Sequence, residues 1–121
     1  MGYELAIDVK PGYLHARVTG ENSREAVLGY LADLRQACLA HDRTNVLVEE
    51  NLRGPSLDMV TIFRVIAGDA AQNAVVGLRI AYVDTNPEHA ADRMQFAETV
   101  AVNRGIQVRV FASVAEAVAW L

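Results

Sequence analysis

The chain has 121 residues, 52% of them hydrophobic and 21% charged, with a formal net charge of −4. This length corresponds to one domain, and this apolar fraction argues against disorder. The 11 basic residues are scattered along the chain, which argues against nucleic acid as a partner. No apolar run approaches the roughly 18 residues that a membrane span needs. The sequence therefore predicts one domain over residues 1–121 with no membrane span.

Two features predict a cytoplasmic protein. Residues 3–9 alternate polar and apolar side chains, without the basic start and apolar core of a signal peptide. Cys38 is the only cysteine, so the chain cannot form an internal disulfide. A lone cysteine of this kind fits a reducing compartment.

The first third of the chain predicts a hairpin followed by a helix. Residues 3–9 and 13–18 alternate as strands do, and Pro11-Gly12 between them is typical of a turn. Asn22, with Glu25 three positions later, predicts the start of a helix with a capping box. Its apolar stripe, at helical spacing, comprises Val27, Leu31, Leu34 and Cys38.

The rest of the chain predicts alternating strands and helices. Residues 45–49 form a buried strand and residues 50–54 a polar loop. A second helix opens at Pro55 and Ser56 and ends before Gly68, and residues 76–83 form the next strand. A third helix, capped by Asn86, runs towards Arg104; a strand follows at 106–111, and Ser113 caps a short last helix.

The predicted order is β-β-α-β-α-β-α-β-α, an α/β fold. Such alternation implies right-handed crossovers and a mostly parallel sheet with an N-terminal hairpin and helices packed against it. Ligands and partners of open α/β sheets usually bind beyond the carboxyl ends of the parallel strands.

That edge supplies the candidate site. Its members are polar residues that follow the predicted strands: Glu49, Glu50, Asn51, Arg53, Ser56, Asp84 and Asn86. The adjacent carboxylates of Glu49 and Glu50 repel each other and are not needed as helix caps. Ser56 is expected at a helix N-terminus, where the helix dipole and free N–H groups favour a phosphate. A simple capping role is the alternative for Ser56, and it is the simplest explanation of Asn86.

No motif predicts catalysis. The sequence contains none of the glycine-rich phosphate-binding or nucleophile motifs. Cys38 lies on an apolar helix face, where a buried thiol is the expected state. None of the three histidines has metal-ligand spacing to a second ligand, and Asp84 with His89 is expected to form an ordinary surface pair. The sequence therefore predicts no enzyme, no catalytic residue, no cofactor and no metal site.

The element order, the Pro-Gly hairpin, the loop before the second helix and the final segment from Phe111 to Trp120-Leu121 resemble the SpoIIAA-like family of STAS-type proteins over the whole chain. This resemblance implies a bacterial, non-enzymatic regulatory module that binds another protein. Related anti-sigma-factor antagonists are switched by phosphorylation of a serine at the start of the second helix, and Ser56 matches that position. Those antagonists carry an Asp-Ser-Ser-Gly-like segment where this chain has Gly54-Pro55-Ser56-Leu57. Other relatives sense small molecules or lipids.

Three hypotheses remain open at this stage. The first is a partner-switching domain that binds a protein through the predicted edge. The second is a small-molecule or lipid binder with an apolar pocket between the second and third helices, lined by Met59, Ile62, Phe63, Met94 and Phe96; ordinary core packing is the alternative explanation of these residues. The third is a homodimer, because Tyr13, Tyr30, Phe96 and Trp120 add much aromatic surface to a small domain.

Overall fold

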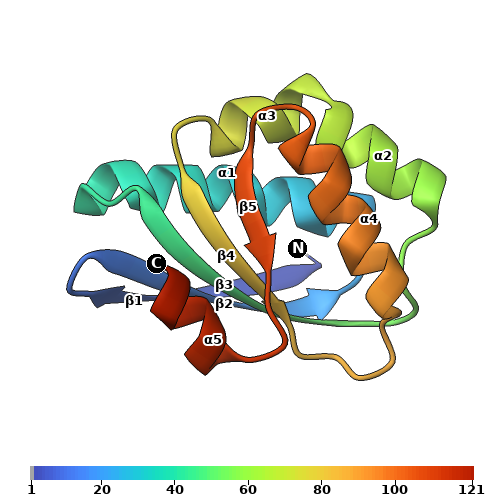
Figure 1. Cartoon of the computed structure of the whole chain (residues 1–121), viewed down its shortest axis with the longest axis horizontal. Coiled ribbons are helices and arrows are strands. Elements are labelled where there is room, and N and C mark those ends of the chain that lie inside the picture. Colours follow the sequence, from blue (N-terminus) through green and yellow to red (C-terminus); the bar gives the residue numbers. More distant parts are fainter. Residues whose placement is uncertain (1) are drawn as a thin grey trace.

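A five-stranded sheet forms the centre of the protein (Figure 1). The structure is a computed structural model that describes residues 2–121. The strands lie side by side in chain order: β1 (Tyr3–Lys10), β2 (Tyr13–Glu21), β3 (Asn45–Arg53), β4 (Arg79–Asp84) and β5 (Gln107–Val110). β1 pairs antiparallel with β2, and all other pairs are parallel. The predicted α/β architecture, with an N-terminal hairpin on a mostly parallel sheet, is confirmed.

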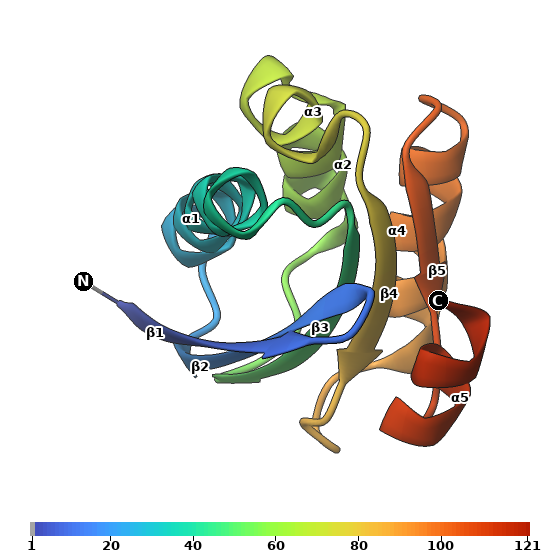
Figure 2. The same ribbon diagram turned by 90° about the vertical axis from the view of Figure 1, so that its left-hand side faces the viewer.

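Five helices cover the sheet. They are α1 (Arg24–His41), α2 (Met59–Ala67), α3 (Asp69–Val75), α4 (Ala91–Val102) and α5 (Val114–Trp120). When successive parallel strands are added to the same edge of a sheet by right-handed β-α-β crossovers, the connecting helices lie on one face of the sheet. Figure 2 shows α1, α2 and α3 on one side of the curved sheet, and α5 on the other side. Within residues 2–121, no helix combines the length and apolarity that crossing a membrane requires.

The pleat of the strands divides the core into two parts, because successive side chains point to opposite faces. On β3, Val46 and Val48 belong to the larger cluster, which includes Leu34 of α1. Leu47 between them belongs to a smaller cluster with Ala117 of α5. The face of any β3 residue therefore follows from whether its number is odd or even.

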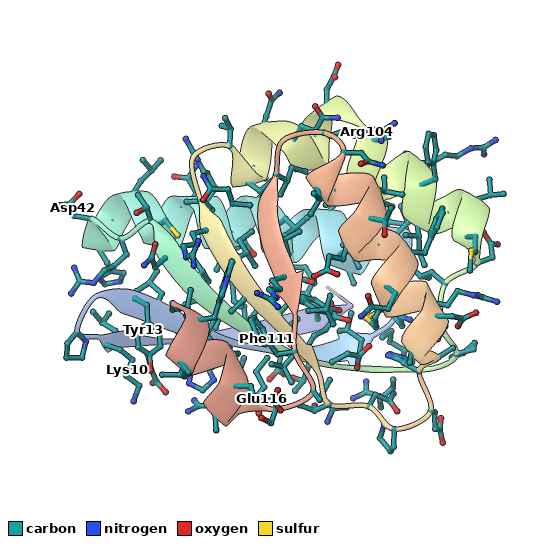
Figure 3. The ribbon with its side chains drawn as sticks, viewed as in Figure 1. Lys10, Tyr13, Asp42, Arg104, Phe111 and Glu116 are labelled. Carbon is teal, nitrogen blue, oxygen red and sulfur yellow. The ribbon has the colours of Figure 1, made fainter. Side chains whose placement is uncertain are left out.

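The aromatic residues expected to exceed the core are largely accommodated within the fold. Tyr30 is buried on the inner face of α1. Tyr13, Phe111 and Trp120 are half-buried and pack on the smaller cluster, and Figure 3 shows Tyr13 and Phe111 beside α5. Phe111 and Trp120 stack with ring centroids 5.6 Å apart.

The first helix begins one residue later than the sequence predicts. Ser23 is the N-cap, and its Oγ accepts a hydrogen bond from the Ala26 amide at 3.0 Å. The predicted cap, Asn22, instead donates from its side chain to the Pro55 carbonyl at 2.8 Å. The fully buried face comprises Ala26, Tyr30, Leu34 and Cys38, with the predicted Val27 and Leu31 half-buried beside it. Burial of Cys38 is confirmed.

The segment between β3 and β4 differs most from the prediction. β3 continues to Arg53, so the expected polar loop at 50–54 is mainly the end of a strand. The following helix begins at Met59 after the N-cap Asp58, whose carboxylate accepts from the Thr61 amide at 2.7 Å. The prediction that Ser56 lies at a helix N-terminus is therefore wrong. A further short helix, α3, occupies 69–75, where none was predicted, and Gly68 ends one helix and begins the next.

Of the two helix caps predicted later in the chain, Asn86 is wrong and Ser113 is confirmed. Asn86 does not cap α4, which begins at Ala91; its Oδ1 accepts from the Glu88 amide at 2.9 Å in a turn. Ser113 caps α5 as predicted, with Oγ accepting from the Glu116 amide at 3.2 Å. Asn86 precedes a proline, and this local signal suits a turn as well as a helix start.

Candidate functional site

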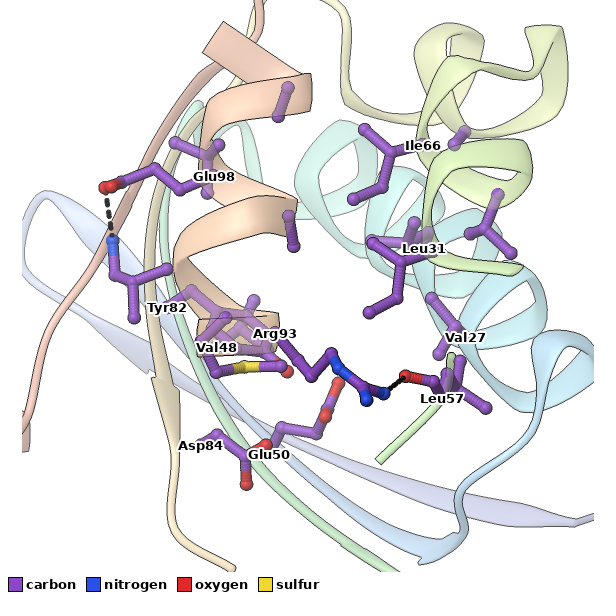
Figure 4. Close-up of a pocket in the computed structure, with 18 of the residues that line it drawn as sticks. Val27, Leu31, Val48, Glu50, Leu57, Ile66, Tyr82, Asp84, Arg93 and Glu98 are labelled. Atoms are coloured by element: carbon purple, nitrogen blue, oxygen red, sulfur yellow. Dashed lines mark hydrogen bonds between the residues drawn. The ribbon is translucent and has the colours of Figure 1, made fainter. Parts of the chain in front are cut away.

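A cavity of about 150 Å³ lies between the inner face of the sheet and helices α1, α2 and α4 (Figure 4). Most of its wall is apolar, supplied by residues such as Leu31, Val48, Ile62, Ile66, Met94 and Ala97. α4 presents Ala97 and Ala101 towards the sheet, and two methyl groups leave space that larger side chains would fill. Of the residues predicted for an apolar pocket, Ile62 and Met94 line this cavity, and Met59, Phe63 and Phe96 do not.

One end of the cavity is polar. Glu50 enters it from β3, with only 4% of the residue exposed. The Tyr30 hydroxyl of α1 donates to Glu50 Oε2 at 2.5 Å. Burial raises the pKa of the Glu50 carboxyl, and hydrogen bonding by Tyr30 and Tyr82 offsets only part of that rise. Glu50 is therefore an acid that takes up a proton more readily than an exposed glutamate.

Asp84 and His89 form a buried ion pair beside Glu50. His89 Nδ1 is 2.6 Å from Asp84 Oδ2, and the side chains are 2% and 5% exposed for His89 and Asp84 respectively. His89 Nε2 lies 2.9 Å from the Gly54 carbonyl oxygen, which only accepts, so Nε2 carries a proton. Burial favours the neutral ring, but the hydrogen bonds to Asp84 and Gly54 outweigh burial and raise the pKa of His89. The predicted surface pair is therefore a buried one.

Side-chain hydrogen bonds hold the loops around this polar end. Asn86 Nδ2 donates to the Leu52 carbonyl at 2.8 Å, and the Thr85 amide donates to the Glu50 carbonyl at 2.8 Å. Ser56 Oγ accepts from the Ala90 amide at 2.9 Å and so ties the chain before α2 to the start of α4. Asn86 and Ser56 thus have structural partners that bring Glu50, Asp84 and His89 together.

The predicted edge of seven residues does not form one cluster. Glu50, Asp84, Asn86 and Ser56 gather around the polar end. Glu49, Asn51 and Arg53 have the opposite parity on β3 and lie on the other face of the sheet. There, Glu49 Oε1 is 2.7 Å from His15 Nε2, and Arg53 lies 3.8 Å from Glu21.

The predicted site omits four residues of the polar end: Tyr30, Tyr82, His89 and Arg93. Tyr30 did carry a signal, because a tyrosine on the buried face of a helix usually needs a hydrogen-bond partner. Arg93 carried none, since an arginine in the first turn of a helix is most often exposed.

Glu50, Asp84 and His89 each offer a ligand atom, and these atoms lie within 4.8 Å of one another. Sequence spacing gave no indication of this cluster, because it depends on the pairing of β3 with β4. A histidine that ligates a metal needs an unprotonated ring nitrogen. Both nitrogens of His89 engage other groups, Asp84 and the Gly54 carbonyl. The geometry therefore matches a hydrogen-bonded network better than a metal centre.

The network predicts that stability falls as pH rises. The pKa values of Glu50 and His89 are both raised by folding, so the folded state holds these protons more tightly. Their contributions are full below the ordinary values of 4.5 and 6.5 and disappear as pH passes through the raised values. The melting temperature is expected to be higher at about pH 5 than at about pH 8.

The variant Glu50→Gln supplies the control for this pH dependence. It preserves the size of the side chain and removes its titration, so the fall in melting temperature with pH should become shallower. Differential scanning fluorimetry of both proteins across this range measures the effect. A melting temperature that rises from about pH 5 to about pH 8 would contradict the raised pKa values.

Comparison of the chain with protein-family models and with curated proteins gives no match.

Proposed function

We propose that this protein is a non-catalytic domain that binds a small, mainly apolar molecule carrying one polar group. The observation that carries this proposal is the cavity between the sheet and α1, α2 and α4, with apolar walls and one hydrogen-bonding end. Binding pockets for small molecules generally have this composition, with a few polar groups that orient the ligand. The small-molecule alternative therefore has more support than the partner switch.

The size of the cavity limits the size of the ligand. A cavity of about 150 Å³ has room for about five water molecules, each of which occupies about 30 Å³ in the liquid. A methylene group occupies a similar volume, and a cavity of about this size admits benzene. The cavity therefore suits a molecule of about 5–7 non-hydrogen atoms.

The contacts at the polar end favour binding over catalysis. Both ring nitrogens of His89 are engaged, by Asp84 and by the Gly54 carbonyl, so the imidazole has no free lone pair. A general base needs a lone pair within reach of the substrate proton. Side chains that hydrogen-bond to one another in this way stabilise the geometry of the site. The proposal therefore includes no chemical step.

A STAS-type, SpoIIAA-like identity remains a proposal, supported by the order of strands and the N-terminal hairpin. Within that family, phosphorylation of the matching serine drives a partner switch. Ser56 does not lie at a helix N-terminus here, and its hydroxyl accepts from the Ala90 amide. These two facts favour a ligand-binding member over a phosphorylation-switched one.

The variant Ala97→Phe tests the proposed function. Ala97 lines the cavity from α4, and a phenyl ring at this position would occupy the space that a ligand needs. We expect the wild-type protein to bind pentanol, a neutral probe of suitable size, and the variant to bind it at least about tenfold more weakly. Isothermal titration calorimetry measures both affinities.

Ala91→Phe is the matched control, because Ala91 lies in the same helix and is exposed. This variant should bind pentanol like the wild type. Equal pentanol affinity in all three proteins would show that the probe binds elsewhere and would contradict the proposal.

A further inference from the structure

Arg93 lines the cavity with a half-buried side chain whose hydrogen bonding is incomplete. It lies in the first turn of α4, and its side chain crosses the polar end towards α2 (Figure 4). One terminal nitrogen, Nη1, donates to the Leu57 carbonyl at 2.8 Å. Its Nε is buried and has no hydrogen-bond partner among residues 2–121.

An unpaired buried donor requires an explanation. Leaving such a group unsatisfied destabilises the folded protein, and more so when the group is charged. Nearly all buried polar groups in native proteins have a partner. An acceptor atom on a molecule bound in the cavity would satisfy the Nε–H of Arg93.

The surrounding charges leave the positive charge of Arg93 uncompensated at close range. Asp84 is paired with His89, and Glu50 accepts from Tyr30. Asp58 interacts with Arg93 electrostatically, but its carboxylate is exposed and accepts from the Thr61 amide. Within residues 2–121, no carboxylate forms an ion pair with Arg93 at 4.0 Å or less.

We infer that the ligand is a lipophilic carboxylic acid, whose carboxylate accepts from Arg93 while its hydrocarbon body fills the apolar part of the cavity. This inference rests on the proposed function. A guanidinium offers a planar set of donors that matches a carboxylate. A single guanidinium also balances the single negative charge of a carboxylate. The size limit corresponds to a short-chain or small cyclic carboxylic acid of about 5–7 non-hydrogen atoms.

A ligand with an amine in place of the carboxylate is the alternative of opposite charge, since Glu50 could accept a hydrogen bond from its ammonium group. Arg93 would then lie beside a second positive charge, and its Nε–H would still have no acceptor. A neutral alcohol can accept from Nε but leaves the charge uncompensated. The order of affinities expected is therefore carboxylate first, then alcohol, then amine.

Titration of pentanoate, pentanol and pentylamine into the same protein tests the inference. The wild type is expected to bind pentanoate at least about tenfold more tightly than either other probe. Arg93→Gln retains a polar side chain without the charge and should lose that preference while still binding pentanol. Arg64→Gln, at an exposed position of α2, is the matched control and should preserve the preference.

Each outcome is decisive once circular dichroism shows that the variants are folded. Pentylamine or pentanol binding as tightly as pentanoate to the wild type would overturn the inference. A pentanoate preference that survives in Arg93→Gln would also overturn it. In both cases pentanol binding would leave the proposed function intact, whereas a failure to bind any of the three probes would remove both proposals. Should Arg93→Gln fail to fold, Arg93→Lys retains the charge without the planar donors and should reduce the preference.

Discussion

The variant His89→Ala is expected to lose about 3–5 kcal/mol of the free energy of unfolding. Removal of the ring leaves the Asp84 carboxylate buried without its partner, and the Gly54 carbonyl without a donor. A buried charge without a partner is much more costly than the loss of an exposed pair. Urea denaturation followed by circular dichroism measures the change.

His41→Ala is the matched control, because His41 is exposed in the last turn of α1. Its effect should stay within about 0.5 kcal/mol. The double variant Asp84→Asn/His89→Ala should be more stable than the sum of the two single losses predicts, since it removes both members of the pair. A loss below about 1 kcal/mol in His89→Ala would contradict the description of a buried, coupled pair.

The variant Leu34→Ala is expected to lose a similar amount, about 3–5 kcal/mol. Leu34 has 0% of its surface exposed and packs between α1 and the sheet. Truncation removes buried methyl groups and leaves a void that the neighbouring strands fill only in part. Leu34 does not line the cavity between the sheet and α1, α2 and α4, so this variant isolates the contribution of the core.

Leu39→Ala provides the comparison on the same helix. Leu39 is 64% exposed, five residues further along α1. The same chemical change should cost less than about 1 kcal/mol there, because little apolar surface is removed from contact with the protein. Equal losses in the two variants, measured by urea denaturation, would mean that α1 does not pack on the sheet through the face described.

Either loss is large for a domain of this kind, whose total stability is typically about 5–15 kcal/mol. The His89 pair and the Leu34 core stabilise different parts of the fold. Leu34 attaches α1 to the sheet. His89 connects the β4–α4 turn, through Asp84 and Gly54, to the segment before α2. The two pairs of variants therefore separate the stability of the scaffold from that of the polar end.

Local sequence signals determined much of the scaffold. The Pro-Gly turn between two alternating segments predicts β1 and β2, and these strands pair as a hairpin. Ser113 with Glu116 predicts the cap of α5. The apolar stripe of α1 predicts the burial of Leu34 and Cys38. Each of these features depends on residues within a few positions of one another, so the sequence alone contains the information.

Element boundaries that depend on distant partners were not predictable in this way. β3 extends to Arg53 because Leu52 and Arg53 pair with Gly20 and Glu21 of β2. Locally, the segment 50–54 is polar enough to be a loop, and only the neighbouring strand supplies its hydrogen bonds. The extra helix α3 is likewise stabilised by its packing against α1 and α2.

The candidate site likewise combines residues that the sequence predicts with features that depend on contacts between distant segments. Composition and strand ends pointed to Glu50, Asp84, Asn86 and Ser56 at one edge of the sheet, and these residues do gather there. The sequence could not exclude Glu49, Asn51 and Arg53, because it did not show that β3 continues through them with alternating faces. Nor could it show that His89 is buried, since that follows from contacts with Asp84 and Gly54.

The sequence by itself therefore determined an α/β domain with a hairpin, parallel strands and capped helices, through local periodicity and capping chemistry. Only the tertiary structure decided that Glu50, His89 and Arg93 border one cavity, because these residues come from three segments that the sheet and loops bring together. The burial that raises the pKa values of Glu50 and His89, and that leaves Arg93 Nε without a partner, exists only once those segments have packed.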